Sequence, residues 1–182
     1  MKTKSEIAVF GGGCFWCTEA IFKMLRGVIS VNPGYAGGQM DNPSYHDVSA
    51  GDTGHAEVIR IEFDSDVIPY KDLLDIFLHT HDPTTLDRQG GDTGTQYRSI
   101  ILYTTDEQRK IAEESLQMLK QSGEFQNPIV TEIKPLTKFY EAEDYHKDYY
   151  AKYSFEPYCQ VVISPKLKHL REKYSSKLKE EN

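Results

Sequence analysis

A pair of cysteines carries the clearest chemical signal in this sequence. Cys14 and Cys17 are separated by two aromatic residues, and they follow the apolar run 7–10 and three glycines at 11–13. This order indicates a strand, a glycine turn and a helix that begins near Cys14. Because the first turn of a helix carries unpaired N–H groups and about half a positive charge, it favours the thiolate form of a cysteine there. We therefore expect Cys14 to be a reactive nucleophile.

The second cysteine leaves several roles open. Cys17 lies one helical turn after Cys14 on the same face, so the pair could form a reversible disulfide as in thioredoxin-like enzymes. A free cysteine can also be a small buried hydrophobe. A zinc site would need two further ligands, and no second Cys-x-x-Cys pair occurs. A dinucleotide fingerprint would place a glycine where Trp16 stands. We expect neither a metal nor an organic cofactor.

A candidate acid follows in the segment Gly54-His55-Ala56-Glu57-Val58. Glu57 opens an apolar strand, and burial raises the pKa of a carboxyl group, so that it can stay protonated at neutral pH. Such a group can donate a proton to an oxygen atom of a substrate. The alternative is a glutamate that faces solvent from the strand.

A third polar cluster lies in the glycine-rich stretch 89–99, which leads into an apolar strand. Its composition is typical of a structured binding loop. Tyr97, together with Tyr45 from an earlier loop, could donate a hydroxyl to a polar oxygen, and Asp92 could hold a substrate amide or a water molecule. Ordinary turn chemistry remains an alternative for each of these residues.

The totals favour a cytoplasmic protein with a single catalytic domain of residues 1–182. The formal net charge of −7 argues against a general nucleic-acid binder. Three cysteines are too few for a disulfide scaffold. No apolar run approaches the ~20 residues of a membrane span, and the run 7–10 is too short for a signal peptide.

The hydrophobic pattern predicts strands and helices without strict alternation. Strands are expected over 7–10, 28–31, 58–63, 100–103, 129–133 and 161–163. Helices are expected over 15–26, from Pro69 to about 77, from a capping box at Thr105 and Gln108 to about 121, within 141–153, and after Pro165. Long loops are expected over 34–54 and 81–96. This order favours an α+β fold with an antiparallel or mixed sheet flanked by helices.

Taken together, these segments resemble the A-type peptide-methionine (S)-S-oxide reductases, the methionine sulfoxide reductase A family. The resemblance spans most of the chain and keeps the order of the motifs of that family. It is carried by Gly13-Cys14-Phe15-Trp16, Gly34-Tyr35-Ala36-Gly37-Gly38, Tyr45, Gly54-His55-Ala56-Glu57-Val58, His81-Asp82-Pro83-Thr84, Gln89-Gly90 and Gln96-Tyr97-Arg98-Ser99.

The resemblance implies thiol-dependent reduction of methionine-S-sulfoxide, free or in proteins, as a repair of oxidative damage. It implies that Cys14 is the nucleophile and that Glu57 is the acid, while Tyr45 and Tyr97 help to bind the sulfoxide oxygen. Attack on the sulfur would release methionine and leave a sulfenic acid on Cys14, which a second thiol converts to a disulfide.

The same resemblance implies a substrate pocket and a fold. Phe15 and Trp16 match the pocket for the S-methyl group, and Asp92 matches a residue near the substrate amide or a site water. The fold implied is an α+β sandwich related to the ferredoxin-like plait, with extensive coil. Thioredoxin or another external dithiol would restore the thiols, and we expect the enzyme to act as a monomer.

The sequence departs from the family at the thiol that resolves the sulfenic acid. Many members carry that cysteine in a glycine-rich C-terminal tail, whereas here Cys159 runs into the apolar segment 161–163 and a helix. Cys17 stands where many members have glycine. We therefore predict that Cys17 is the resolving thiol, with Cys159 as the alternative.

Two rival functions remain at this point. A general disulfide oxidoreductase would use Cys14 and Cys17 without depending on Glu57. A binding module for methionine-containing peptides would bind without turnover, and it would leave the thiol at the helix start unexplained.

Overall fold

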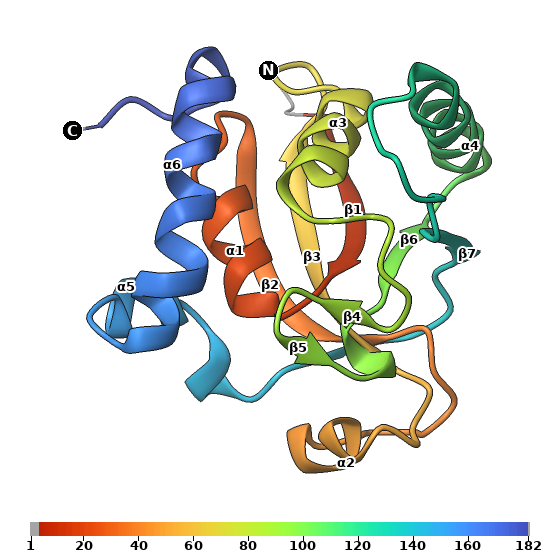
Figure 1. Ribbon diagram of the computed structural model, residues 1–182, viewed down its shortest axis with the longest axis vertical. Coiled ribbons are helices and arrows are strands. Elements are labelled where there is room, and N and C mark those ends of the chain that lie inside the picture. Colours follow the sequence, from red (N-terminus) through yellow and green to blue (C-terminus); the bar gives the residue numbers. More distant parts are fainter. Residues whose placement is uncertain (1–3, 182) are drawn as a thin grey trace.

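The computed structural model describes residues 4–181, and within them the central feature is a six-stranded mixed sheet (Figure 1). The strand order is β7-β6-β1-β3-β2-β8. All neighbours are antiparallel except β6 and β7, which are parallel. The α+β class with a mixed sheet and flanking helices is therefore confirmed. The strands of this sheet are β1 (Ser5–Gly12), β2 (Val28–Ala36), β3 (Ala56–Asp64), β6 (Ser99–Tyr103), β7 (Glu132–Pro135) and β8 (Phe139–Glu141).

Helices and a small hairpin surround this sheet. The helices are α1 (Phe15–Lys23), α2 (Tyr45–Ala50), α3 (Tyr70–Thr80), α4 (Asp106–Ser122), α5 (Tyr149–Tyr153) and α6 (Ser164–Lys173). Short 3₁₀ turns span Thr95–Tyr97, Asp144–His146 and Ser175–Lys177, and Cys159–Ile163 forms a π-helical turn. The hairpin consists of β4 (Arg88–Gln89) and β5 (Asp92–Thr93). No helix within residues 4–181 combines the length and the apolar character that crossing a membrane requires.

The two central strands are apolar on both faces. In β1 and β3, Phe10 is paired with Ile59, and successive side chains point to opposite faces of the sheet. Phe10 faces the helices, where it stacks on Phe77 of α3 at 4.8 Å and contacts Phe22 of α1 at 5.8 Å between ring centroids. The opposite face carries a second, smaller apolar cluster. It includes Val9, Ala36, Ala56, Val58, Ile100 and Leu102 together with Leu136 and Phe139.

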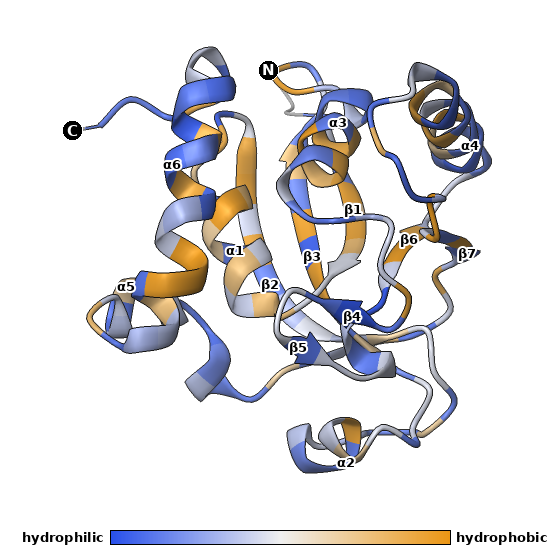
Figure 2. Ribbon diagram, viewed as in Figure 1, coloured by the Kyte–Doolittle hydropathy of each residue, from blue (hydrophilic) through white to orange (hydrophobic). Residues whose placement is uncertain are grey.

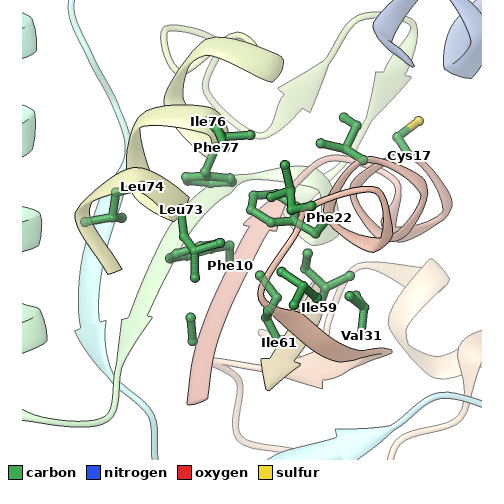
Figure 3. Packing of buried hydrophobic residues seen from close by; sticks show 14 of the residues in the cluster. Phe10, Cys17, Phe22, Val31, Ile59, Ile61, Leu73, Leu74, Ile76 and Phe77 are labelled. Carbon is green, nitrogen blue, oxygen red and sulfur yellow. The ribbon is translucent and has the colours of Figure 1, made fainter. Parts of the chain in front are cut away.

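The hydropathy of the residues agrees with this division between buried strands and surrounding loops. In Figure 2, β1 and β3 are largely hydrophobic, whereas the β4–β5 hairpin is hydrophilic. Figure 3 shows Cys17 at the edge of the main core, with its sulfur pointing away from the labelled apolar side chains. The first turn of α1 therefore lies where the apolar core meets polar loops.

The turn from β1 into α1 depends on glycine. Gly13 has a φ of +96°, and a Cβ atom there would lie 2.6 Å from the side chain of Gln89. A Cβ atom on Gly12 would lie 2.8 Å from the ring of Phe77. Only glycine fits these close approaches without displacement of a neighbour. The glycines thus allow the protein itself, rather than a ligand, to pack against this turn.

Several local predictions differ from the structure. The strand expected over 129–133 begins at Glu132, and the region 141–153 holds only two short helical turns. The strand expected over 161–163 is wrong, because this apolar segment belongs to the π-helical turn that continues directly into α6. The loop expected over 34–54 contains α2, which begins with a reciprocal capping box between Ser44 and Asp47.

Candidate active site

Cys14 lies at the junction of the central sheet and the first helix. It is the N-cap residue of α1, two residues after β1 ends at Gly12. Its side chain is largely buried, with 8% of its surface exposed. The strand fixes the backbone on one side of the thiol and the helix fixes it on the other, so the sulfur is held on two regular elements.

The protonation state of Cys14 differs from the sequence-based expectation. Burial raises the pKa of its thiol well above the ordinary value, and the hydrogen bond to Cys17 and the charge of Glu57 act in the same direction. The backbone N–H of Trp16 has the opposite effect, but it does not outweigh them. The expectation that the helix start makes Cys14 a thiolate is therefore wrong for the site without substrate.

Glu57 lies beside Cys14 because β3 is the neighbour of β1 in the sheet. Its side chain is buried, with 2% exposed, and its Oε1 accepts a hydrogen bond of 3.2 Å from the backbone N–H of Phe15. Burial raises the pKa of this carboxyl to about 8, although the Phe15 N–H partly opposes the shift. The group is therefore mainly a neutral acid at pH 7, and it can donate a proton.

Two tyrosine hydroxyl groups lie in the same electrostatic environment. Tyr45 is the first residue of α2, and Tyr97 is the last residue of the 3₁₀ turn that precedes β6. Burial raises the pKa of both hydroxyls, and the charges of Glu57 and Cys14 contribute to the shift. Both groups thus remain protonated donors near the thiol and the carboxyl.

An aromatic cluster lies beside the thiol on the first turn of α1. The Nε1–H of Trp16 donates to Nδ1 of His146 at 3.1 Å, and Tyr149 stacks on the indole with 3.7 Å between centroids and an interplanar angle of 4°. The ring of Phe15 packs against His146 at 5.0 Å and Tyr35 at 5.8 Å. These contacts hold the indole of Trp16 in place beside Cys14, whereas Phe15 is 1% exposed and belongs to the core.

Asp92, which the sequence analysis predicted to bind substrate, contacts Tyr158, a residue that the sequence analysis did not select as a site residue. Its Oδ2 accepts a hydrogen bond of 2.7 Å from the hydroxyl of Tyr158. The oxygen of Tyr158 lies 3.8 Å from Sγ of Cys17. The hairpin β4–β5 is itself held by Gln89, whose side-chain amide exchanges two hydrogen bonds of 3.0 Å with the backbone of Asp82.

The three cysteines are all free thiols, but their surroundings differ. Cys17 is hydrogen-bonded to Cys14, and this bond is the largest cause that lowers the pKa of Cys17 to about 7, against the effect of its burial. Cys159 is fully buried in the π-helical turn, and burial raises the pKa of its thiol.

A cleft of about 370 Å³ opens over the paired thiols. Cys14 and Cys17 form part of its wall, and Asp92 and Tyr158 lie beside them. The remaining lining comes from the β4–β5 hairpin and the start of α6, namely Gln89, Gly90, Gly91, Val161, Val162, Pro165 and Lys166. Among residues 4–181, no group of three or more histidine, cysteine, aspartate or glutamate side chains is placed to hold a metal ion. The arrangement is that of a thiol site with an adjacent neutral acid.

Comparison with known proteins decides the family. The sequence profile described as "Peptide methionine sulfoxide reductase" matches residues 6–179. The chain belongs to this family. Peptide methionine sulfoxide reductase MsrA of Saccharolobus solfataricus is 57% identical over 175 residues, which cover 96% of this chain and 97% of that protein. The MsrA of Deinococcus radiodurans is 52% identical over 174 residues, covering 96% and 84% respectively.

Solved structures of similar chains agree with the fold. Mxr1 from Saccharomyces cerevisiae in reduced form superposes with a TM-score of 0.81 at 34% identity, covering 87% of this chain and 91% of that one. Mxr1 in complex with Trx2 superposes with a TM-score of 0.58 at 26% identity, covering 79% and 84%.

The structure of this peptide methionine sulfoxide reductase also adds residues that the sequence did not indicate. His146, Tyr149 and Tyr158 contact the aromatic pair and the second thiol from a segment more than 120 positions away in sequence. The only signal in the sequence was the tyrosine-rich stretch 141–153 and the Pro157-Tyr158-Cys159-Gln160 motif. Neither pattern specifies which earlier residue such a side chain contacts.

Proposed function

We propose that this chain reduces methionine-S-sulfoxide, free or in proteins, to methionine, with Cys14 as the nucleophile. Its family makes it an oxidoreductase for methionine sulfoxide. The observation that carries the assignment of residues is the contact next to Cys14. There the buried, neutral carboxyl of Glu57 accepts a hydrogen bond of 3.2 Å from the backbone N–H of Phe15. A nucleophile and a proton donor thus stand side by side, as reduction of a sulfoxide requires.

The first step joins the two groups in one reaction. A sulfoxide sulfur is electrophilic, but its oxygen is a poor leaving group until it is protonated. Glu57 gives its proton to that oxygen, while the hydroxyls of Tyr45 and Tyr97 stabilise the developing charge. The sulfur of Cys14 attacks the protonated sulfoxide, and its own thiol proton passes to the carboxylate of Glu57. The S–O bond of the substrate breaks as an S–O bond to Cys14 forms, so methionine leaves and Cys14 holds the oxygen as a sulfenic acid.

The substrate is held by its methyl group and its backbone. Phe15 and Trp16 provide the apolar surface for the S-methyl group, and the contacts of Trp16 to His146 and Tyr149 support a fixed indole. Asp92 lies in the wall of the cleft, where it can reach a substrate amide or a site water. The preference for the S epimer is part of the proposal.

Cys17 is the resolving thiol in this proposal. The neighbouring Cys14 lowers the pKa of Cys17 to about 7, and this pKa and the position of Cys17 in the wall of the cleft support this role. Cys159 would have to leave a fully buried position in the π-helical turn before it could reach the sulfenic acid. The disulfide that forms is then reduced by thioredoxin or another dithiol. The solved complex of yeast Mxr1 with Trx2 supports a thioredoxin in this step.

We also propose a fold subclass, an oligomeric state and a cellular location for this chain. In the order β1-α1-β2-β3-α3-β6, the strands β6, β1, β3 and β2 are neighbours, which is the pattern of a ferredoxin-like plait. We place catalysis in a single domain of residues 1–182 that works as a cytoplasmic monomer and binds neither nucleic acid nor membrane. No metal or organic cofactor enters the reaction.

The test is turnover of separated methionine sulfoxide epimers with dithiothreitol. The wild-type chain should convert the S epimer to methionine and leave the R epimer unchanged, and Cys14→Ser should be inactive. Equal turnover of both epimers would contradict the stereochemical assignment, and activity in Cys14→Ser would contradict the nucleophile.

A further inference from the structure

The buried position of Cys17 raises a question about its proton. Cys17 has 2% of its surface exposed. To form a disulfide with the sulfenic acid on Cys14, it must lose the hydrogen of its thiol, because the thiolate is the form that attacks. A group that contacts Cys17 and connects it with the cleft would provide a route for that proton.

Tyr158 is such a group. Its hydroxyl oxygen lies 3.8 Å from Sγ of Cys17, within hydrogen-bonding distance for sulfur, and its hydrogen is donated to Oδ2 of Asp92 at 2.7 Å. A hydroxyl has one hydrogen, so the side that faces Cys17 offers a lone pair. The thiol of Cys17 therefore donates to Tyr158, and Tyr158 donates to Asp92.

The position of this tyrosine is fixed by several elements. Tyr158 immediately precedes the π-helical turn Cys159–Ile163, and its ring packs edge-on against Trp16, with 5.8 Å between centroids and an interplanar angle of 83°. Asp92 comes from the β4–β5 hairpin. Helix, hairpin and C-terminal segment thus meet in one chain of hydrogen bonds, whose far end is a partly exposed carboxylate in the cleft.

We propose that Tyr158 is a catalytic residue of the disulfide-forming step, in which it carries the proton of Cys17 to Asp92. The inference rests on the proposed role of Cys17 as the resolving thiol. As the sulfur of Cys17 attacks the sulfur of Cys14, the S–H bond of Cys17 and the S–O bond of Cys14 break and an S–S bond forms. The departing hydroxide is protonated to water, and Asp92 returns the relayed proton to solvent, so the step releases one water and no net proton.

The electrostatic setting is consistent with a relay. Burial raises the pKa of the Tyr158 hydroxyl, as do the neighbouring thiols and Asp92, so the tyrosine passes a proton without remaining charged. The hydrogen bond from Cys14 is the largest cause that lowers the pKa of Cys17, and Lys166 and the hydrogen bond with Tyr158 act in the same direction, whereas burial and Asp92 raise it. The groups that shift the pKa of Cys17 are Cys14, Asp92, Tyr158 and Lys166. The charge of Cys17 in turn raises the pKa values of Glu57 and Cys159.

The relay also explains the orientation of Asp92. Its Oδ2 points to Tyr158 in the absence of substrate, so the same carboxylate can serve a substrate amide in the first step and the proton of Cys17 in the second. The two roles can be separated by kinetics, because methionine leaves before the disulfide forms.

The test is a single turnover of Tyr158→Phe with methionine-S-sulfoxide, compared with the wild type and with Tyr103→Phe as a matched control in β6. The ring is kept and the hydroxyl is lost. Methionine release should continue, while disulfide formation should slow about tenfold or more near pH 6, and trapped Cys14 sulfenic acid should accumulate. The deficit should shrink above about pH 7, where Cys17 has already lost its proton without the relay. Disulfide formation at the wild-type rate across this pH range would overturn the proposal.

A second variant guards against a merely structural effect. Asp92→Asn can still accept the hydrogen bond from Tyr158 but is a far weaker base, so disulfide formation should slow with a similar pH dependence. An Asp92→Asn protein that changes only the KM for substrate would overturn the relay. Cys17→Ser separates this inference from the proposed function. If that variant still forms an intramolecular disulfide, Cys17 is not the resolving thiol. If only the results expected for Tyr158→Phe and Asp92→Asn are not observed, the relay alone is wrong.

Discussion

The backbone N–H of Phe15 donates a hydrogen bond of 3.2 Å to the side-chain carboxyl of Glu57. This contact has two consequences for the residue between strand and helix, Cys14. It holds the carboxyl of Glu57, which burial keeps neutral, at the start of α1, and it occupies the first free N–H of the helix, which would otherwise stabilise a thiolate. In the resting site both the nucleophile and the acid therefore carry a proton. In the proposed mechanism, the Cys14 thiol becomes an effective nucleophile only when a sulfoxide oxygen accepts a proton beside it.

Loss of the acid should affect sulfoxide reduction far more than thiol exchange. Glu57→Gln keeps the shape of the side chain and an oxygen for the Phe15 N–H, but it removes the acidic proton. We expect kcat/KM for methionine-S-sulfoxide to fall by about 10²–10⁴-fold, the usual contribution of a general acid. Glu62→Gln, a partly exposed position on the same strand, is the matched control. Wild-type turnover in Glu57→Gln would show that Glu57 is not the proton donor.

The same carboxyl predicts a pH dependence of stability. The pKa of Glu57 is about 8 in the folded protein, against ~4.3 for an unperturbed glutamate. Between these values the unfolded chain loses the proton and the folded one keeps it. The free energy of unfolding should therefore fall by about 1.4 kcal/mol per pH unit from this group, until the pH has risen through 8. Urea unfolding at several pH values should show this slope in the wild type and a reduced slope in Glu57→Gln; identical slopes would be inconsistent with a buried neutral carboxyl.

The thiol that ionises first should be Cys17. Its pKa is lowered to about 7, chiefly by the hydrogen bond from Cys14, whose own pKa is raised. Thiolate absorbance in the ultraviolet should rise with a midpoint near pH 7 and disappear from that range in Cys17→Ser. Cys14→Ala should move the midpoint to higher pH, because the donor is lost. A midpoint near 7 that persists in Cys17→Ser would assign the thiolate to another cysteine.

His146 should control the position of Trp16. An indole N–H can only donate, so Nδ1 of His146 accepts and the proton of the neutral ring lies on Nε2. Loss of one such bond, at about 1 kcal/mol, should raise KM about fivefold in His146→Phe with a smaller change in kcat.

The fluorescence of the protein reports on this contact directly, because Trp16 is its only tryptophan. Burial lowers the pKa of His146, so protonation and loss of the acceptor should change the emission only below about pH 6.5. Exposed His169→Phe is the control. An acid transition that survives unchanged in His146→Phe would show that another group causes it.

Local signals in the sequence were sufficient for much of the fold and for the position of the first thiol. The side chain of Thr105 accepts the N–H of Gln108 and Gly123 ends α4 in the left-handed conformation, as predicted, but the side chain of Gln108 accepts from the N–H of Thr104 and so does not complete the capping box. The apolar residues over 58–63 correctly indicated a central strand, and the structure pairs it with the strand before Cys14. These features depend on neighbours within a few residues.

Features that depend on distant partners could not be predicted from the sequence. The pKa of Cys14 is raised because the chain brings Glu57 and Cys17 to it in a buried setting, which overrides the helix start. The segment 161–163 is apolar enough for a strand, yet it packs as a helical turn with the buried Cys159. The contact of Tyr158 with Cys17 spans 141 positions in sequence, and no local pattern encodes it.

The most direct test of the account is a single turnover of the double variant Cys17→Ser, Cys159→Ser with methionine-S-sulfoxide. With both candidate resolving thiols removed, the reaction should stop after one equivalent of methionine, and mass spectrometry should find one added oxygen on the peptide that contains Cys14. Methionine release without an oxidised Cys14, or no methionine release from a folded variant, would contradict attack by this thiol on the sulfoxide.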